Sequence, residues 1–301
     1  MSIVSINAII EKAKKVKKKP VIAVVEAQEE HTIQSVIKAS EDGIAIPIFI
    51  GDVEKIRKML SKCVGSREGY EIIQSEKPQD SVRLAAQLVN KGIVTAIMKG
   101  KIGSGDLIRA ILDKNNDLLI GRMLSLAGIF APPRYHKIFA VSDVGLNTRP
   151  DLNCKKAIIE NAVLMLRVLG VEKPKVAVLA AFEKASAKMP EAIDAQILKN
   201  MNENKELVNC IIEGPISFDL ATSKEAVKIK DYDSPVGGDA DLLVVPDIVS
   251  GNILAKCLTG FSGSQTAGAV LGAKVPIAFS SRSAEIADKY NSIALAVCIS
   301  G

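Results

Sequence analysis

The fold is decided by the stretch Val94-Thr95-Ala96-Ile97-Met98-Lys99-Gly100-Lys101-Ile102-Gly103-Ser104-Gly105-Asp106. Its first five residues form a short apolar run, which predicts a strand buried on both faces. A glycine-rich loop follows, and the helix-period segment Asp106–Asp113 begins where the loop ends. The stretch therefore predicts a strand, a polar loop at the carboxyl end of that strand, and a helix.

The same alternation recurs along the chain. Further apolar runs rich in Val, Ile and Ala predict parallel strands, at Val21–Ala27, Ile44–Ile50, Lys137–Val141, Lys175–Ala181, Cys210–Ile212, Leu242–Val245 and Val275–Phe279. Between them lie segments with helical periodicity, at Glu29–Ser40, Val53–Lys62, Ser81–Asn90, Leu152–Leu169, Pro190–Asn204 and Asn252–Phe261. This order indicates an α/β fold with mainly parallel sheets and right-handed crossovers.

A length of 301 residues favours two domains, each with its own core. The clearest break is Gly128–Tyr135, which contains two adjacent prolines. We expect a first α/β domain formed by residues 1–130 plus 281–301 and a second formed by residues 131–280. The chain after Ser281 should return to the first domain, because its loop must face the Lys99–Arg109 loop across one cleft.

The net charge of +5 comes from one place, because Glu11–Lys19 holds six lysines and one glutamate. We interpret this run as the solvated face of a helix at Ile6–Lys18, with attraction of an anionic partner as the alternative. A basic stripe with interleaved aromatic residues is absent, which argues against a nucleic-acid partner.

Cysteine and histidine usage limits the chemistry. The five cysteines are scattered and form no CxxC pair, and there are only two histidines, which argues against disulfides and zinc. No apolar run approaches the roughly 20 residues of a membrane span, and the start of the chain is unlike a signal peptide. We therefore expect a cytoplasmic protein without a metal site or membrane partner, whose chemistry rests on carboxylates, hydroxyls, lysines and arginines.

The glycine-rich loop is the first candidate site. Its amides, Lys99, Ser104 and the following Arg109 indicate a cradle for a phosphate or carboxylate. The spacing is not that of a Walker loop, and the chain has no GxGxxG. The alternative is a glycine-rich turn with a helix cap.

The second candidate follows the strand Val275–Phe279 and consists of Ser281, Arg282 and Asp288. If a helix begins at this strand end, Ser281 and Asp288 lie on one face roughly 10 Å apart. The alternative is a serine helix cap with a solvated Asp288. A third polar stretch, Ser234–Asn252, lacks EF-hand spacing, and we interpret it as a turn and a helix cap rather than a metal loop.

Many collinear segments after about residue 90 share one family pattern. They are Met98-Lys99-Gly100 with Asp106 and Arg109, Ser142-Asp143 with Asn147, Pro150-Asp151-Leu152, Lys173–Ala181, Lys188-Met189-Pro190, Glu213-Gly214-Pro215, Ser234–Asn252, Gly268–Pro276, Ser281-Arg282 and Asn291–Ala296. In these segments the sequence resembles the phosphate acetyl/butyryltransferases, and more closely the phosphate butyryltransferase branch. One departure is Leu126, where butyryl-type members commonly have a histidine.

The resemblance implies reversible transfer of a short-chain acyl group, butyryl or similar, between coenzyme A and inorganic phosphate. It also implies two three-layer α/β/α domains around a central cleft, as in isocitrate and isopropylmalate dehydrogenases, and a homodimer formed through the second domain. Coenzyme A is then a substrate, with no tightly bound cofactor.

The resemblance also implies residue roles. Ser281, Arg282 and Asp288 match a catalytic serine–arginine pair with its aspartate, and Arg109 matches an arginine that contacts coenzyme A or phosphate. The chemistry agrees, because a carboxylate raises the thiolate fraction of coenzyme A and a guanidinium stabilises an oxyanion. Lys99, Gly100, Ser104 and Arg109 are the predicted substrate-binding residues.

Two alternatives stay open. One is a module that binds coenzyme A or acyl phosphate without catalysis. The other is a dehydrogenase of related fold, but the metal ligands and nicotinamide-binding signals that such enzymes need are not found in the sequence.

Overall fold

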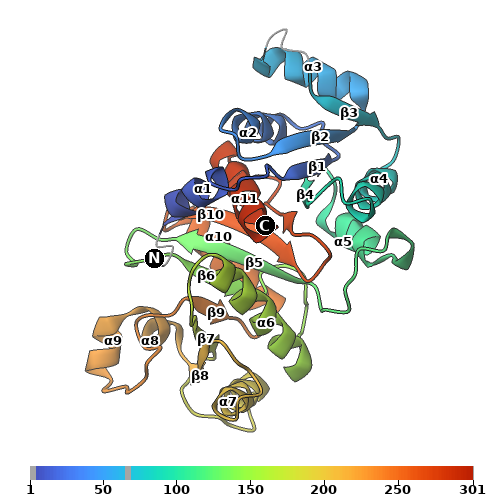
Figure 1. Cartoon of the computed structure of the whole chain (residues 1–301). Helices are drawn as coiled ribbons and strands as arrows, with labels where there is room; N and C mark the ends of the chain where they lie inside the picture. The colour runs from blue at the N-terminus through green and yellow to red at the C-terminus, as the bar shows by residue number, and fades with distance from the viewer. Residues whose placement is uncertain (1–4, 65–68, 301) are drawn as a thin grey trace. The chain divides into compact units, whose positions relative to one another are not determined.

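A computed structural model describes residues 5–64 and 69–300 and divides the chain into two compact units (Figure 1). The first, here the N-terminal unit, consists of Asn7–Arg122 and the chain from Ala267 onward. The second, here the middle unit, consists mainly of Met123–Thr266. The chain therefore passes from one unit to the other between residues 122 and 123 and again between residues 266 and 267. The break expected near residue 130 falls instead in the hairpin of β5 (Ser125–Ala131) and β6 (Phe139–Ser142), inside the middle unit. All the candidate site residues lie in the N-terminal unit.

The N-terminal unit contains a sheet whose strands follow the order β3-β2-β1-β4-β11-β10. The strands are β1 (Val21–Val25), β2 (Ile46–Gly51), β3 (Glu71–Gln74), β4 (Ala96–Lys99), β10 (Gln265–Leu271) and β11 (Ile277–Ala278). Neighbours are parallel except β10 and β11. Because Val25 pairs with Lys99 and Met98 with Ala278, β1, β4 and β11 end side by side.

Helices cover both faces of this sheet (Figure 1). They are α1 (Ile6–Lys14), α2 (Glu30–Glu41), α3 (Val53–Val64), α4 (Pro78–Asn90), α5 (Ser104–Leu112) and α11 (Ile286–Ile299), with a 3-10 turn at Lys114–Asn116. Helix α2 packs against α11, and α4 packs against α5. The core between the layers is apolar and includes the fully buried Phe49, Ile97 and Met98.

Helix α1 is shorter than the sequence predicted. It ends at Lys14 rather than Lys18. The next amides, of Lys15 and Val16, bond to carbonyls three residues back, and the Lys19 ammonium donates to the Lys14 carbonyl at 2.7 Å. Its Ile6, Ile9 and Ala13 are buried while most lysines of the run are exposed. Exposure of the lysine run to solvent is confirmed, whereas its place on a helix face holds only for Lys12 and Lys14.

The middle unit has strands in the order β5-β6-β9-β7-β8. They are β5 (Ser125–Ala131), β6 (Phe139–Ser142), β7 (Lys175–Leu179), β8 (Ile211–Ile216) and β9 (Leu242–Val244), and only the β5–β6 pair is antiparallel. Its helices are α6 (Leu152–Val168), α7 (Pro190–Glu203), α8 (Phe218–Thr222), α9 (Lys224–Ile229) and α10 (Ile248–Gly260). The α/β fold with mainly parallel strands is thus confirmed.

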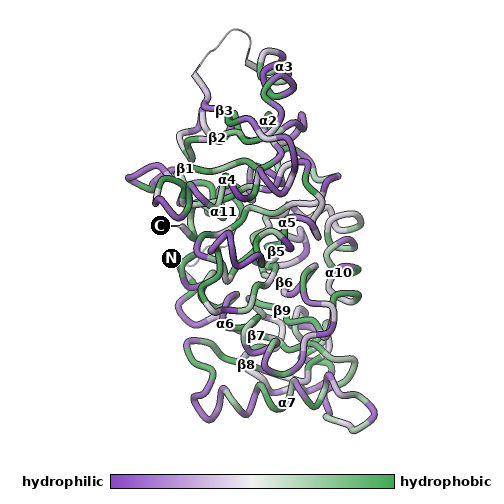
Figure 2. The backbone as a smooth tube through the Cα atoms, turned by 90° about the vertical axis from the view of Figure 1, so that its right-hand side faces the viewer, coloured by the Kyte–Doolittle hydropathy of each residue, from purple (hydrophilic) through white to green (hydrophobic). Residues whose placement is uncertain are grey.

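The stretch Ser234–Asn252 forms a turn, strand β9 and a helix cap, as predicted. Asp247 accepts the Ser250 amide at 2.8 Å in a capping box that starts α10. Only Gly251 and Leu258 of α10 are buried, although Figure 2 colours much of this helix as hydrophobic. Among the described helices, none is both long and apolar enough to cross a membrane.

Candidate active site

The candidate site of the N-terminal unit is built on the adjacent ends of β1, β4 and β11. The glycine-rich loop leaves β4 directly against the end of β1, where the Gly100 amide donates to the Val25 carbonyl at 2.9 Å. A Cβ at Gly100 would lie 2.3 Å from the Glu26 carbonyl oxygen and 2.6 Å from that of Val25. Only glycine permits this close approach, which fixes the loop at the strand ends.

The loop then enters α5. Gly103 is the N-cap and supplies no side-chain cap, and Ser104 is the first helical residue. Arg109, one turn further, donates to the Asp106 carboxylate at 2.8 Å, while 77% of its side chain is exposed. The alternative of a glycine-rich turn with a helix cap therefore agrees with this geometry as well, while Arg109 has a guanidinium that an anion can reach.

Lys99 is the most unusual residue of the site, because its ammonium group is buried without an anionic partner. The residue is 4% exposed, and its Nζ lies 3.5 Å from the Gly100 carbonyl oxygen and 5.5 Å from the centre of the Phe279 ring. Burial, and then the charges of Lys289 and Arg282, lower the pKa of Lys99 from 10.5 to about 8, against the opposing effect of Glu29. In the described residues no ion pair to Lys99 is found.

A second buried lysine, not expected from the sequence, lies at this place. Lys289 lies in the first turns of α11, is 2% exposed, and has its Nζ 3.4 Å from the Glu29 carboxylate. Glu29 in turn caps α2 by accepting the Thr32 amide at 2.9 Å. The available signal was a lysine directly before the apolar segment Tyr290–Cys298 of a helix.

The structure corrects the geometry expected for Ser281, Arg282 and Asp288. Helix α11 begins at Ile286 with Glu285 as its N-cap, so Ser281 and Arg282 lie in the preceding turn and share no helix face with Asp288. A serine cap is also wrong, because Ser281 instead contacts the Ser283 hydroxyl at 3.1 Å. Ser281 and Arg282 are exposed, and Asp288 is half-buried in the first turn of α11.

Glu26 is a further buried carboxylate at the end of β1. It accepts the Ser81 hydroxyl at 2.5 Å and the Gln28 amide at 2.9 Å, so neutral donors satisfy it. Across the described part of the chain, no group of three or more His, Cys, Asp or Glu side chains is placed to hold a metal ion.

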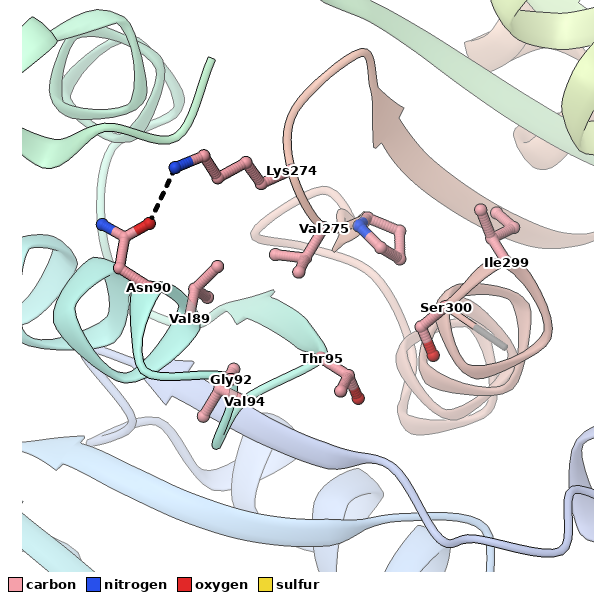
Figure 3. Close-up of a pocket in the computed structure, with 10 residues that line it drawn as sticks. Val89, Asn90, Gly92, Val94, Thr95, Lys274, Val275, Ile299 and Ser300 are labelled. Carbon is pink, nitrogen blue, oxygen red and sulfur yellow. Dashed lines mark hydrogen bonds between the residues drawn. The ribbon is translucent and has the colours of Figure 1, made fainter. Parts of the chain in front are cut away.

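A cavity of about 520 Å³ lies at the opposite ends of the same strands (Figure 3). Its lining includes residues just before β4 and β11, namely Val94, Thr95 and Val275, together with Asn90 and Lys274. The Lys274 ammonium is already held by Asp117 at 2.6 Å and by Asn90 at 3.0 Å. Ligands of parallel α/β sheets bind at the carboxyl ends of strands, so we assign the chemistry to the Lys99 end and not to this cavity.

Comparison with known proteins gives the family. The family described as phosphate acetyl/butaryl transferase matches residues 66–297. A phosphate acetyltransferase of Thermotoga maritima is 36% identical over 91% of this chain and 93% of its own length. A phosphate butyryltransferase of Clostridium acetobutylicum is 33% identical over 99% of this chain and 98% of its own length.

The structural comparison agrees. The crystal structure of a branched-chain phosphotransacylase from Enterococcus faecalis superposes with a TM-score of 0.82 at 29% identity, covering 93% of this chain and 99% of that one. The fold is therefore that of the phosphotransacylases. The chain belongs to the phosphate acetyl/butyryl transferase family, which confirms the resemblance found in its sequence.

Proposed function

We propose that this protein is a phosphate acyltransferase that moves a short-chain acyl group, butyryl or similar, between coenzyme A and inorganic phosphate. Its family supports the reaction class. The observation that carries the site is the buried Lys99 ammonium, which has no carboxylate partner and shares its surroundings with Arg282 and Lys289. Such a surplus of buried positive charge is stabilised by an anionic ligand such as a phosphoryl group.

The proposed reaction places Asp288, Arg282 and Ser281 at the reacting atoms. In the direction that consumes coenzyme A, the Asp288 carboxylate takes the thiol proton, and the thiolate attacks the acyl carbonyl of the acyl phosphate. Arg282 stabilises the tetrahedral oxyanion, and the C–O bond then breaks to release phosphate. Ser281 donates a hydrogen bond to the thioester. In reverse, phosphate attacks the thioester and the C–S bond breaks.

Substrate binding is assigned to the glycine-rich loop and α5. Lys99 and the amides around Gly100 and Ser104 take the phosphate or acyl phosphate, and the exposed Arg109 takes an anionic group of coenzyme A. The proposal includes coenzyme A as a substrate, no tightly bound cofactor and no metal. We also propose that the two compact units are the two domains of the enzyme.

The test is a thiol-release assay with phosphate and acetyl-, propionyl-, butyryl- and isobutyryl-CoA. Asp288→Asn should lower turnover by about 10²–10⁴, the usual effect of general base catalysis, with little change in coenzyme A affinity. The matched control is Asp80→Asn, since Asp80 also lies in the first turn of a helix but forms an exposed ion pair with Arg83. It should remain fully active.

Two outcomes would contradict the proposal. Full activity of Asp288→Asn would remove the carboxylate from the mechanism. Binding of coenzyme A without thiol release from any acyl-CoA would instead support the non-catalytic module.

We further propose a homodimer formed through α10 of the middle unit. This helix and the residue after it expose three large apolar side chains spaced four and eight positions apart, at Val249, Ile253 and Phe261. Phe261 is 93% exposed. A second copy of the chain would cover this stripe. Ile253→Glu should give a monomer in light scattering, whereas Ile229→Glu, at an exposed apolar residue of α9, should leave the dimer intact. A monomeric wild-type protein would contradict the proposal.

A cytoplasmic location is proposed on the state of the cysteines. All five are unpaired, and Cys210 and Cys298 are buried. Burial raises the pKa of Cys210 to about 11, which keeps this thiol unreactive. Fractionation of cells that express the tagged full chain tests the location, and recovery of the chain outside the cytoplasm would contradict it.

A further inference from the structure

The candidate site holds two buried ammonium groups and one carboxylate that faces them. Lys99 and Lys289 are 4% and 2% exposed, and both interact with Glu29. The three residues come from different elements, since Lys99 ends β4, Lys289 lies in α11 and Glu29 precedes α2. Their charges therefore meet only in the folded unit.

Glu29 is committed to Lys289 and to the start of α2. One carboxylate oxygen lies 3.4 Å from the Lys289 Nζ, and the same oxygen accepts the Thr32 hydroxyl at 2.6 Å. Burial raises the pKa of Glu29, but the Thr32 hydroxyl, Lys289 and two backbone amides outweigh it and hold that pKa below its usual value. The carboxylate is thus ionised and does not form an ion pair with Lys99.

The other groups around Lys99 do not neutralise it. Arg282, in the turn after β11, adds a like charge, and the ring of Phe279 faces the ammonium. Glu26, at the end of β1, is satisfied by Ser81 and Gln28. The charge of Glu29 also acts on Lys99, because it opposes the lowering of the Lys99 pKa.

We propose that Lys289 is a positioning residue that engages Glu29 and so leaves the Lys99 ammonium available to bind the phosphoryl group of phosphate or acyl phosphate. This inference rests on the proposed function, because it assigns the phosphoryl group to Lys99. Lys289 itself acts through Glu29 and needs no contact with the substrate. The buried pair of Lys289 and Glu29 thus determines whether the Lys99 ammonium is unpaired when phosphate or acyl phosphate binds.

Lys289→Met tests the inference, since it removes the charge and keeps an unbranched side chain. Glu29 then pairs with Lys99, so the KM for phosphate should rise about tenfold or more, because a nearby carboxylate cancels much of the attraction to an anion. The KM for coenzyme A should stay within about twofold of the wild-type value, because the change weakens the binding of phosphate alone.

The pH profile gives a second readout that a merely structural role would not move. Phosphate binding needs protonated Lys99, so it weakens as pH rises past the Lys99 pKa of about 8. Loss of the Lys289 charge and pairing with Glu29 both raise that pKa. The alkaline limb of kcat/KM for phosphate should therefore move to higher pH in Lys289→Met than in the wild type.

The decisive variant is the double change Glu29→Gln with Lys289→Met. It removes the competing carboxylate while keeping an oxygen for the α2 cap, so the KM for phosphate should return to within about threefold of the wild type. Lys289→Arg should keep wild-type phosphate binding. The control Arg83→Met breaks an exposed pair with Asp80 on α4 and should change neither KM.

Phosphate affinity measured by calorimetry on the same proteins separates the possible failures. If the wild type releases no thiol but shows the expected affinity pattern, acyl transfer is wrong, while binding of phosphate by Lys99 and the positioning role of Lys289 stand. If the enzyme is active but the double variant binds phosphate no better than Lys289→Met, the inference is overturned. Should Lys289→Met fail to fold, Glu29→Gln alone decides, because it should bind phosphate more tightly than the wild type, and unchanged binding would refute the inference.

Discussion

Lys99→Met should stabilise the protein while it impairs phosphate binding. Burial and two like charges lower the pKa of Lys99 from 10.5 to about 8, and one pKa unit corresponds to about 1.4 kcal/mol. Keeping this ammonium charged in the folded state at pH 7 therefore costs about 3 kcal/mol. Methionine has a similar volume and no charge, so the variant should be more stable by about that amount.

The sign of the pH dependence follows from proton binding. Between pH 8 and 10.5 the unfolded chain binds more protons at residue 99 than the folded chain, so wild-type stability rises with pH over this window. Below pH 8 the full cost is present. The advantage of Lys99→Met should accordingly be largest at pH 7 and nearly absent above pH 10.

Urea unfolding of both proteins at pH 7 and pH 10, at one protein concentration, measures this difference. Lys101→Met is the control, because Lys101 is the exposed lysine of the same loop, and it should change stability by less than about 0.5 kcal/mol. A Lys99→Met protein that is less stable at pH 7, or whose advantage is the same at both pH values, would refute the argument that an unpaired charge is buried here.

Three further predictions concern single residues. Gly100→Ala should destabilise the N-terminal unit by about 3 kcal/mol or more, because the new Cβ would collide with the Glu26 carbonyl oxygen. Thermal unfolding followed by circular dichroism measures this loss. The control is Gly105→Ala, where a Cβ meets nothing within 4 Å. Asp239→Asn should destabilise the protein at neutral pH, because burial raises the Asp239 pKa but hydrogen bonds with Lys175 at 2.6 Å, with His136 and with Lys137 outweigh it and hold that pKa well below its usual value. The deficit should shrink as unfolding is measured at pH falling below 4, and a pH-independent deficit would argue against it. Arg109→Ala should raise the KM for coenzyme A more than it lowers kcat, and an equal loss in both would place Arg109 at the reacting atoms instead.

Much of the fold could be predicted because buried parallel strands have a distinct sequence signal. Runs such as Val21–Val25 and Ala96–Lys99 are covered on both faces and are therefore almost continuously apolar. The strands β3, β5 and β10 were missed. β5 and β10 are interrupted by Gly and Ala, which are depleted in strands, and β3 is only partly buried and has no continuous apolar run.

Prediction of the candidate site was limited by the contacts between distant segments. Lys99 and Gly100 were found because the loop follows a recognisable strand and ligands bind at such strand ends. The pairing of Lys289 with Glu29 was not found, because it joins α11 to the start of α2 and depends on the packing of those helices. Burial of both lysines is likewise a property of the folded unit and has no local signal.

The start of α11 shows how a local error changes a site. A helix directly after Phe279 would have placed Ser281 and Asp288 on one face by helical geometry alone. The helix instead begins after Glu285, and the intervening turn carries Ser281 and Arg282 as exposed residues. The positions of the serine and arginine therefore depend on the turn, whereas that of Asp288 depends on α11, which Lys289 ties to Glu29. The proposed base and the proposed oxyanion donor thus lie on separate segments, and the buried Lys289–Glu29 pair belongs to the helix that carries Asp288.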